Sequence, residues 1–348
     1  MPLVPNLDDS PDVEHPLVKS TYVSQKSEVH HEEWGAICVT KNEWFSLFFS
    51  NLEILSNSTL ARRLAHASLS NSMKMSYETW SPKKSFLTFL NEKYAINAFE
   101  NWSKDRIHLG RGIVTPVNWP YSFHIERPLM VSIEVGEICA YLQSIIGHSL
   151  RYQWRDDGGS NASVTFEKID VPLNQHETIA IENFEKLPTK LDVDKGFGWP
   201  TRDGIKINVI PTAVFHEFYK TLGELEIEIS DDPIISTNEL AGELENLVSM
   251  ASLKSCSNDS QRYLLDNYEQ MNTWFNQRIE SNGFGKLISA SFGSDLKLKF
   301  RFFIPWPILS GIILDAWQRN NGILGVIDVK SIEGNSVEMI IRSRREIA

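Results

Sequence analysis

Apolar residues in the C-terminal part of the chain change from helical to alternating spacing. Leu264, Tyr268, Met271, Phe275 and Ile279 recur at helical spacing and predict an amphipathic helix. From residue 286 the period becomes two, which indicates strands. The pattern predicts helices at 213–222, 237–254 and 260–280, strands at 286–291 and 296–303, a helix at 307–320, and a hairpin formed by 324–331 and 336–343.

The N-terminal part repeats this order. Its pattern predicts helices near 42–51, 58–73 and 83–106, strands near 111–117 and 121–127, a helix near 130–146, and a hairpin that turns at 156–159. Each part therefore has the order helices, two strands, a helix and two strands. That order is typical of an α+β domain in which helices cover one face of a four-stranded antiparallel sheet.

Glycines repeat at a constant separation. Gly110, Gly136, Gly147 and Gly159 each have a counterpart 175 residues later, at Gly285, Gly311, Gly322 and Gly334. Apolar positions follow the same separation, with a thinner match upstream that pairs Trp44 with Tyr219 and Leu47 with Leu222. Self-similarity at a fixed period indicates a repeated unit, so we expect a tandem duplication. Two unrelated stretches in accidental register are the alternative.

The duplication sets the expected boundaries. Residues 1–32 are polar and rich in proline, and we expect a mobile tail there. The first repeat spans 33–168 and the second 208–348. The connector over 169–207 contains scattered prolines and charges, with a short helix expected at 177–186.

This order resembles the 4-vinyl-reductase-like domain superfamily, whose relatives include Bet-type TRAPP trafficking subunits and haem nitric-oxide-binding domains. The resemblance rests on a long helix ending in LGRG or GFGK, a hairpin, a glycine-bearing helix and a closing hairpin. It covers the latter half of each repeat. It implies the topology and a non-catalytic sensing or scaffolding role. Small-molecule-binding members often carry cysteines near the last helix, where this chain has only Cys139, so no ligand or metal residue is transferred.

Charge and cysteine content narrow the classes of function. The formal charge is −11, which disfavours general binding to nucleic acid or anionic membrane, because phosphate contacts require Lys and Arg. The three cysteines include no CxxC pair, which fits free thiols in a reducing compartment. No signal-peptide pattern and no long apolar run are present. We therefore expect a cytoplasmic protein with no membrane span.

The best ligand-facing candidates lie where the long helix of the first repeat ends. Trp102, Arg106, His108 and Arg111 place an aromatic ring, two cations and an imidazole near one helix–strand junction. The second repeat replaces the corresponding helix end, and a site lost in one copy is a common outcome of duplication. At this junction, the 175-residue match pairs only one basic residue with another basic residue: Arg111 with Lys286. A surface helix end is the alternative interpretation.

Other motifs have simpler explanations. The run His30-His31-Glu32-Glu33 has metal-ligating residue types, but adjacent residues rarely face one ion, so we predict no metal. Asp156 to Asn161 resembles part of a calcium loop, yet a hairpin turn accounts for it. The glycines around Arg111 follow a helix, which is the reverse of a phosphate-binding loop and favours a helix cap. Trp306 and Trp317 are expected in the core, with an interface as the alternative.

These patterns favour a non-catalytic protein that senses a ligand or acts as an interaction scaffold, with no cofactor. Its expected partners are a small molecule or another protein, and a homo-oligomer is left open. The alternative is an enzyme with acid–base groups, such as His108 and His148, in a cleft between the repeats. The search finds no catalytic or nucleotide-binding signature, so no catalytic residue is assigned and whether the chain is an enzyme stays open.

Overall fold

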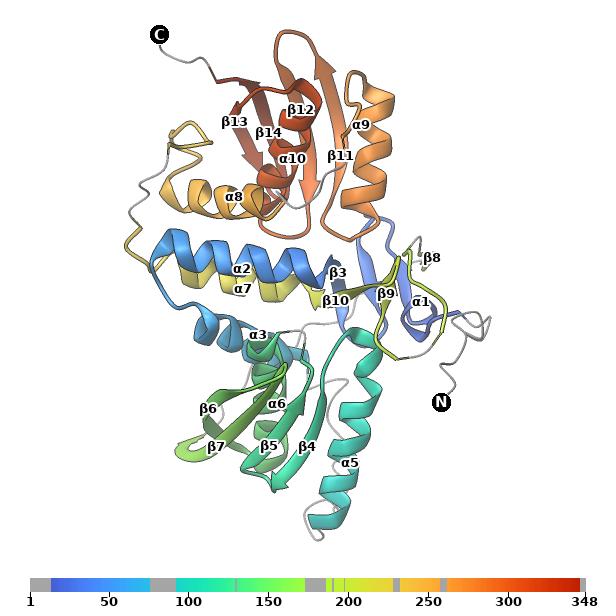
Figure 1. Ribbon diagram of the computed structural model, residues 1–348, viewed down its shortest axis with the longest axis vertical. Coiled ribbons are helices and arrows are strands. Elements are labelled where there is room, and N and C mark those ends of the chain that lie inside the picture. The colour runs from blue at the N-terminus through green and yellow to red at the C-terminus, as the bar shows by residue number, and fades with distance from the viewer. Residues whose placement is uncertain are drawn as a thin grey trace, which may run out of the picture.

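The computed structural model describes residues 14–75, 92–128, 130–172, 186–189, 191–196, 198–227, 232–256 and 262–344. Three layers follow one another along the long axis (Figure 1): a four-stranded sheet with its helices at each end, and a central layer between them. The chain is thus a mixed helix and strand protein with antiparallel sheets, as the sequence predicts.

The N-terminal half, defined here as residues 35–172, follows the predicted order with one added strand. Its elements are β3 (Gly35–Lys41), α2 (Asn42–Ser56), α3 (Ala61–Met75), α5 (Glu92–Asp105), a short 3₁₀ turn (Ile107–Leu109), β4 (Ile113–Asn118), β5 (Ser122–Glu126), α6 (Val131–Ile146), β6 (His148–Gly158) and β7 (Asn161–Pro172). The sheet order is β4-β5-β7-β6. Residues 83–91 of the predicted long helix lie outside the described residues.

The C-terminal half, residues 205–343, has the same order. Its elements are β10 (Ile205–Pro211), α7 (Thr212–Leu222), α8 (Glu243–Ser255), α9 (Tyr268–Phe275), a π-helical turn (Asn276–Glu280), β11 (Gly285–Phe292), β12 (Leu296–Phe302), α10 (Trp306–Asn321), β13 (Gly325–Glu333) and β14 (Ser336–Ser343). Its sheet order, β11-β12-β14-β13, matches that of the other half. Trp306 and Trp317 are buried, as expected.

The central layer is built around two strands that the sequence pattern missed. β3 and β10 pair antiparallel, with Val39 opposite Val209 and Lys41 opposite Ile207. These registers are symmetric about the Val39–Val209 pair, as they would be across a two-fold axis. Both strands are almost wholly apolar at their centres and buried on both faces, so they lack the alternation that reveals a half-buried strand.

Each half contributes its first helix to the other half. α2 packs against α8 of the C-terminal half, and α7 packs against α3 of the N-terminal half. Phe45 and Phe215 meet across the centre at a ring distance of 5.7 Å. The two halves are therefore interlocked through the strand–helix units β3–α2 and β10–α7, rather than stacked as two separate bodies.

The N-terminal segment differs from the expected mobile tail. Residues 14–32 contain α1 (Pro16–Lys19), β1 (Thr21–Val23) and β2 (Val29–His31), while residues 1–13 lie outside the described residues. With β8 (Leu187–Pro188) and β9 (Thr201–Arg202) they extend the central sheet to the order β8-β1-β2-β3-β10-β9. Burial of Leu17, Val29 and Trp34 holds the segment in place. The helix expected at 177–186 falls outside the described residues, except for Lys186.

The structure corrects the register of the match at the helix–sheet joint, the point where α5 or the π-helical turn leads into the first strand of its sheet. Gly110 and Gly283 both adopt left-handed backbone, at φ of 82° and 71°. The Arg111 N–H bonds to the Arg106 carbonyl, and the Phe284 N–H bonds to the Ile279 carbonyl. Equivalent positions here are 173 residues apart, so Arg111 corresponds to Phe284 and not to Lys286.

Elsewhere the 175-residue match coincides with equivalent geometry. Gly136 of α6 lies against the Ala65 carbonyl of α3, and Gly311 of α10 lies against the Ser249 carbonyl of α8. The upstream pairing shifts to 170 residues, because the strand registers align Val39 with Val209. The connections between equivalent elements differ in length, so a single separation fails to align the whole chain.

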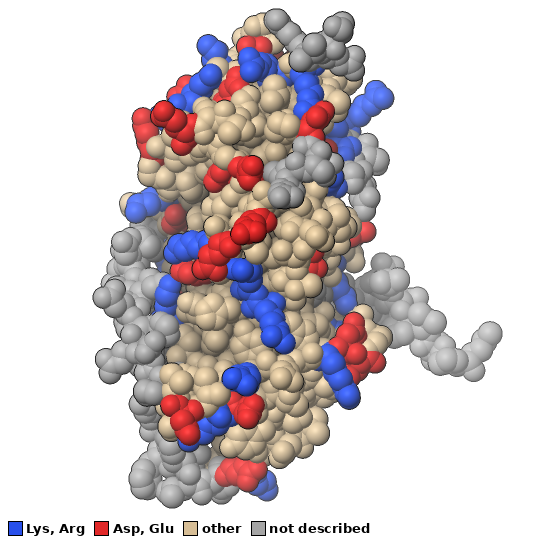
Figure 2. All heavy atoms as spheres, turned by 90° about the vertical axis from the view of Figure 1, so that its left-hand side faces the viewer, with Lys and Arg blue, Asp and Glu red and all other residues tan. Residues whose placement is uncertain are grey.

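The surface carries both signs of charge. On the face shown in Figure 2, acidic and basic side chains are interspersed, and no large basic field covers it. None of the helices in the described ranges combines the length and the apolar character that a membrane crossing requires.

Candidate functional site

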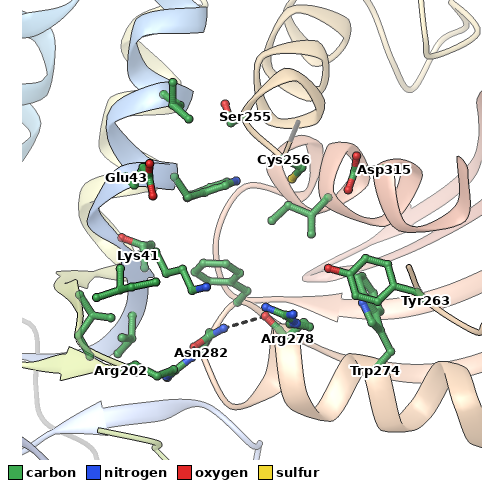
Figure 3. Close-up of a pocket in the computed structure, with 18 residues that line it drawn as sticks. Lys41, Glu43, Arg202, Ser255, Cys256, Tyr263, Trp274, Arg278, Asn282 and Asp315 are labelled. Atoms are coloured by element: carbon green, nitrogen blue, oxygen red, sulfur yellow. Dashed lines mark hydrogen bonds between the residues drawn. The ribbon is translucent and has the colours of Figure 1, made fainter. Parts of the chain in front are cut away.

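A pocket of about 340 Å³ lies between the two halves (Figure 3). The N-terminal half supplies β3 and the start of α2, and the C-terminal half supplies the ends of α8 and α9, the π-helical turn and one face of α10. The volume is within the range of small-molecule sites, roughly 300–1,000 Å³. Its lining residues are Val39, Thr40, Lys41, Glu43, Trp44, Leu47, Arg202, Ile205, Ile207, Ser255, Cys256, Tyr263, Trp274, Arg278, Asn282, Phe284, Ile312 and Asp315.

One end of the pocket is cationic. Figure 3 shows Lys41, Arg202 and Arg278 gathered around Asn282. Arg202 donates to the Asn282 side-chain oxygen at 3.0 Å and to the Asp192 carbonyl at 2.8 Å. Burial lowers the pKa of Arg202, while Asp192 acts in the opposite direction. These bonds hold the guanidinium in one place at the pocket wall.

The side of the pocket next to Arg278, away from Lys41 and Arg202, is aromatic. Tyr263 and Trp274 pack edge to face with ring centres 5.9 Å apart, and the Arg278 guanidinium lies 5.8 Å from the Tyr263 ring. The π-helical turn that carries Arg278 directly follows Trp274 and Phe275. Such turns occur often at functional sites, because they re-aim side chains within a helix.

Three buried polar atoms in this lining have no hydrogen-bond partner within the described chain. They are the Thr40 hydroxyl, the Trp274 indole nitrogen and one terminal nitrogen of Arg202. Thr40 is 3% exposed and Trp274 is 7% exposed. An unsatisfied buried polar group costs about 1–3 kcal/mol, so each of these atoms is a place where a hydrogen bond to a further molecule would be favourable.

The acidic residue Asp315 is already neutralised. Its carboxylate accepts a hydrogen bond from Arg319 at 2.7 Å, and Arg319 also bonds to the Cys256 carbonyl at 2.8 Å. The charge that faces the pocket interior is therefore dominated by the three basic side chains, with Glu43 at the other end.

The structure places the four sequence-predicted residues together in the N-terminal half, outside this pocket. Trp102, Arg106 and His108 line an open cleft of about 790 Å³. Arg111 is buried behind it, at 2% exposure, and binds both oxygens of the Glu137 carboxylate at 2.9 Å. The cleft and the four residues lie around the helix–sheet joint, as the sequence predicts.

The cations of this cluster are matched by buried acids. Arg106 contacts Glu137 and lies 3.9 Å from Glu134, and its guanidinium covers the Trp102 ring at 4.1 Å. Burial lowers the pKa of Arg106 to about 9 and of Arg111 to about 10. It raises the pKa of Glu134, against the opposing effect of both arginines. Two arginines facing two glutamates form an internal ionic cluster rather than a free anion site.

The adjacent histidines point in different directions. His30 stacks on Tyr22, whereas His31 stacks on His108 with ring centres 5.9 Å apart, because neighbouring residues of a strand face opposite sides. Burial, followed by His108, lowers the pKa of His31 to about 4. In the described part of the chain, no group of three or more His, Cys, Asp or Glu is arranged to hold a metal ion.

The pocket residues were missed because their positions depend on the central strands. Lys41 ends β3, and Arg202 belongs to β9 in the stretch expected as a connector. The one available signal was the AICVT run at 36–40, an uninterrupted short stretch typical of a strand buried on both faces. Neither His108 nor His148, the acid–base candidates, lines the pocket between the halves.

A scan against protein-family models found no match to this chain, and neither did the comparisons with curated proteins and with solved structures.

Proposed function

We propose that this chain is a non-catalytic ligand-sensing protein whose ligand occupies the pocket between its two halves. The observation that carries the proposal is the lining itself: a wall built from both halves, in which Thr40, Trp274 and Arg202 present buried polar atoms without partners. A ligand that satisfies these atoms would bridge β3–α2 of one half to α9–α10 of the other. Binding would therefore stabilise contacts in both halves.

The proposal takes the halves as diverged copies of one ancestral domain. It is supported by the shared sheet order, by the symmetric pairing of β3 with β10, and by the two helix crossings at Gly136 and Gly311. Equivalent surfaces pair in two-fold dimers, and duplication would make such a pairing intramolecular. The resemblance to the 4-vinyl-reductase-like superfamily agrees with a sensing role.

Thermal unfolding with a collection of small metabolites tests the proposal. A ligand at 100 times its Kd adds about 2.7 kcal/mol to the free energy of unfolding, which raises Tm by several degrees. Leu47→Phe, which enlarges a lining residue on α2, should abolish that rise. A matched control is Ile54→Phe, because Ile54 is exposed on the same helix at 71% and lies outside the pocket.

Two results would count against the proposal. If no compound stabilises the parent chain, or if Leu47→Phe responds like the parent, then the pocket is not a ligand site. Mass spectrometry of the stabilising compound after incubation addresses the enzyme alternative. Recovery of the unchanged compound supports sensing, and conversion to a product would replace it with catalysis.

A further inference from the structure

We infer that the ligand of this pocket is a small planar organic anion rich in hydrogen-bond acceptors, which deepens and rests on the proposed function. The inference comes from the kinds of polar atoms that the pocket leaves unsatisfied. The Arg202 nitrogen and the Trp274 indole nitrogen can only donate, and the Thr40 hydroxyl can donate as well. A ligand that pairs all three must therefore bring acceptors.

Charge specifies the acceptor at one end. Lys41, Arg202 and Arg278 surround Asn282, whereas the described lining holds two acids, Glu43 and Asp315, of which Asp315 is bound to Arg319. The three cations therefore outnumber the acids of the lining. Guanidinium groups match carboxylate and phosphate oxygens in geometry, and such charge-assisted bonds are about twice as strong as neutral ones. The anionic group of the ligand is placed at this end.

The walls specify the rest of the molecule. Trp44, Phe284, Tyr263 and Trp274 contribute rings, and Ile312 and Leu47 contribute aliphatic surface. Flat aromatic walls favour a flat ring, since ring pairs contribute about 0.5–1.5 kcal/mol beyond the area that they bury. Trp274 stands beside Arg278 and across the pocket from Lys41 and Arg202 (Figure 3), so a second acceptor on the ring, away from the group that meets Lys41 and Arg202, would reach its N–H.

Isothermal calorimetry with 6-hydroxy-2-naphthoate tests this class. Its matched neutral probe is 6-hydroxy-2-naphthamide, which has nearly the same shape without the charge. We expect the acid to bind the parent chain at least tenfold more tightly than the amide. The preference should weaken as salt concentration rises, because salt screens the basic end.

Two variants test the donors, of which Thr40→Val is near-isosteric. Trp274→Phe removes the indole N–H and keeps a ring, and Thr40→Val removes the hydroxyl and keeps the shape. Each should weaken binding of the acid at least threefold. Thr40→Val should not lower the urea midpoint of the ligand-free chain, because it removes a buried hydroxyl that has no partner there. Trp274→Phe also removes ring surface packed against Tyr263, so it should lower the midpoint through lost packing, and its effect on binding is measured where the chain is fully folded. If the Thr40 hydroxyl had only a structural role, Thr40→Val would lower the urea midpoint and leave binding of the acid unchanged.

Lys41→Gln should weaken the acid at least tenfold and leave the amide unchanged. The control Lys297→Gln, on an exposed position of β12 away from the pocket, should change neither. Equal binding of acid and amide would overturn the anion class while leaving the pocket a ligand site. Failure of both probes to bind would overturn the planar anion, and the metabolite screen then decides separately whether the pocket binds anything.

Discussion

The helix–sheet joints of the two halves have the same backbone and opposite chemistry. In the N-terminal half, the joint holds Arg106, Arg111, Glu134 and Glu137, all buried. At the equivalent positions, the C-terminal half holds Ile279, Phe284, Leu309 and Ile312. One fold therefore accepts either an ionic cluster or hydrocarbon at this place.

The difference separates a joint whose charges pair with one another from a joint that forms an apolar wall. In the N-terminal half, Trp34, between β2 and β3, lies over Arg111 at 4.9 Å, and the buried charges pair with one another. In the C-terminal half, the apolar Phe284 and Ile312 line the 340 Å³ pocket. The charges of the first joint hold structure together, whereas the apolar second joint forms a wall of the candidate site.

Replacing Glu137 should produce the largest effect. Glu137→Ile installs the residue of the other half and leaves Arg106 and Arg111 with Glu134 as the remaining buried acid. Breaking a buried ion pair from one side costs about 3–5 kcal/mol, because the remaining charge is buried without compensation. Urea unfolding should show this loss. The matched change Ile312→Val in the C-terminal half should cost about 0.5–1.5 kcal/mol or less.

Exchanging all four residues of the joint tests whether the loss of stability comes from an unpaired buried charge or from the shape of the new side chains. Arg106→Ile, Arg111→Phe, Glu134→Leu and Glu137→Ile together transfer the apolar set into the N-terminal half. Replacement of a complete buried ionic cluster by hydrocarbon is often neutral or stabilising, so the fourfold variant should recover most of the loss. If it is less stable than Glu137→Ile alone, the two joints are not equivalent, and the comparison fails.

Acid should lower the free energy of unfolding through His31, which stacks on His108 beside the ionic joint of the N-terminal half. Burial holds the pKa of His31 at about 4, against 6.5 for an ordinary histidine, so the unfolded chain binds more protons between these values. The free energy of unfolding therefore falls as pH drops from 6.5 to 4, by up to about 3 kcal/mol from this group. Urea unfolding across this range should show a smaller decrease in His31→Phe than in the parent.

A histidine on the surface provides the control. His66 is exposed on α3, and His66→Phe should retain the parent's pH dependence. An unchanged slope in His31→Phe would mean that other groups account for the acid sensitivity. Acid sensitivity would then not distinguish the joint of the N-terminal half from that of the C-terminal half.

The sequence predicted most of each half and little of how the halves combine. Amphipathic helices such as α9 and alternating strands such as β12 carry a period that reads directly from the residues. β3 and β10 are buried on both faces and show no alternation, so the central layer escaped notice. With β3 missed, Lys41 could not be placed opposite Arg278, and the pocket could not be predicted.

For the four candidate residues at the end of α5, the predicted proximity is seen in the structure. Trp102, Arg106, His108 and Arg111 were placed together correctly, because they lie within one helix end and the turn that follows it. Their partners Glu134 and Glu137 were missed. Both lie on α6, a helix buried on nearly every side, where an acid looks like a surface residue unless its arginine is known. Long-range charge pairing is the information that a single sequence lacks.

The smallest expected effect is at the place where the halves agree. A methyl group at Gly136 would overlap the Ala65 carbonyl, and one at Gly311 would overlap the Ser249 carbonyl. The Ser68 hydroxyl bonds to the Ile133 carbonyl in one crossing, and the Ser252 hydroxyl bonds to the Ile308 carbonyl in the other. Each glycine therefore permits the close helix approach on which its serine bond depends.

Gly136→Ala and Gly311→Ala should each destabilise the chain by about 1–3 kcal/mol through overpacking, less a gain of up to about 1 kcal/mol from the helix preference of alanine. Because the two crossings have the same geometry, the two losses in urea unfolding should agree within about 1 kcal/mol. A large loss at one glycine and none at the other would show that the halves share strand order without sharing packing. The exchange of charge for hydrocarbon at the joints would then be one of many differences rather than a change made on a common frame.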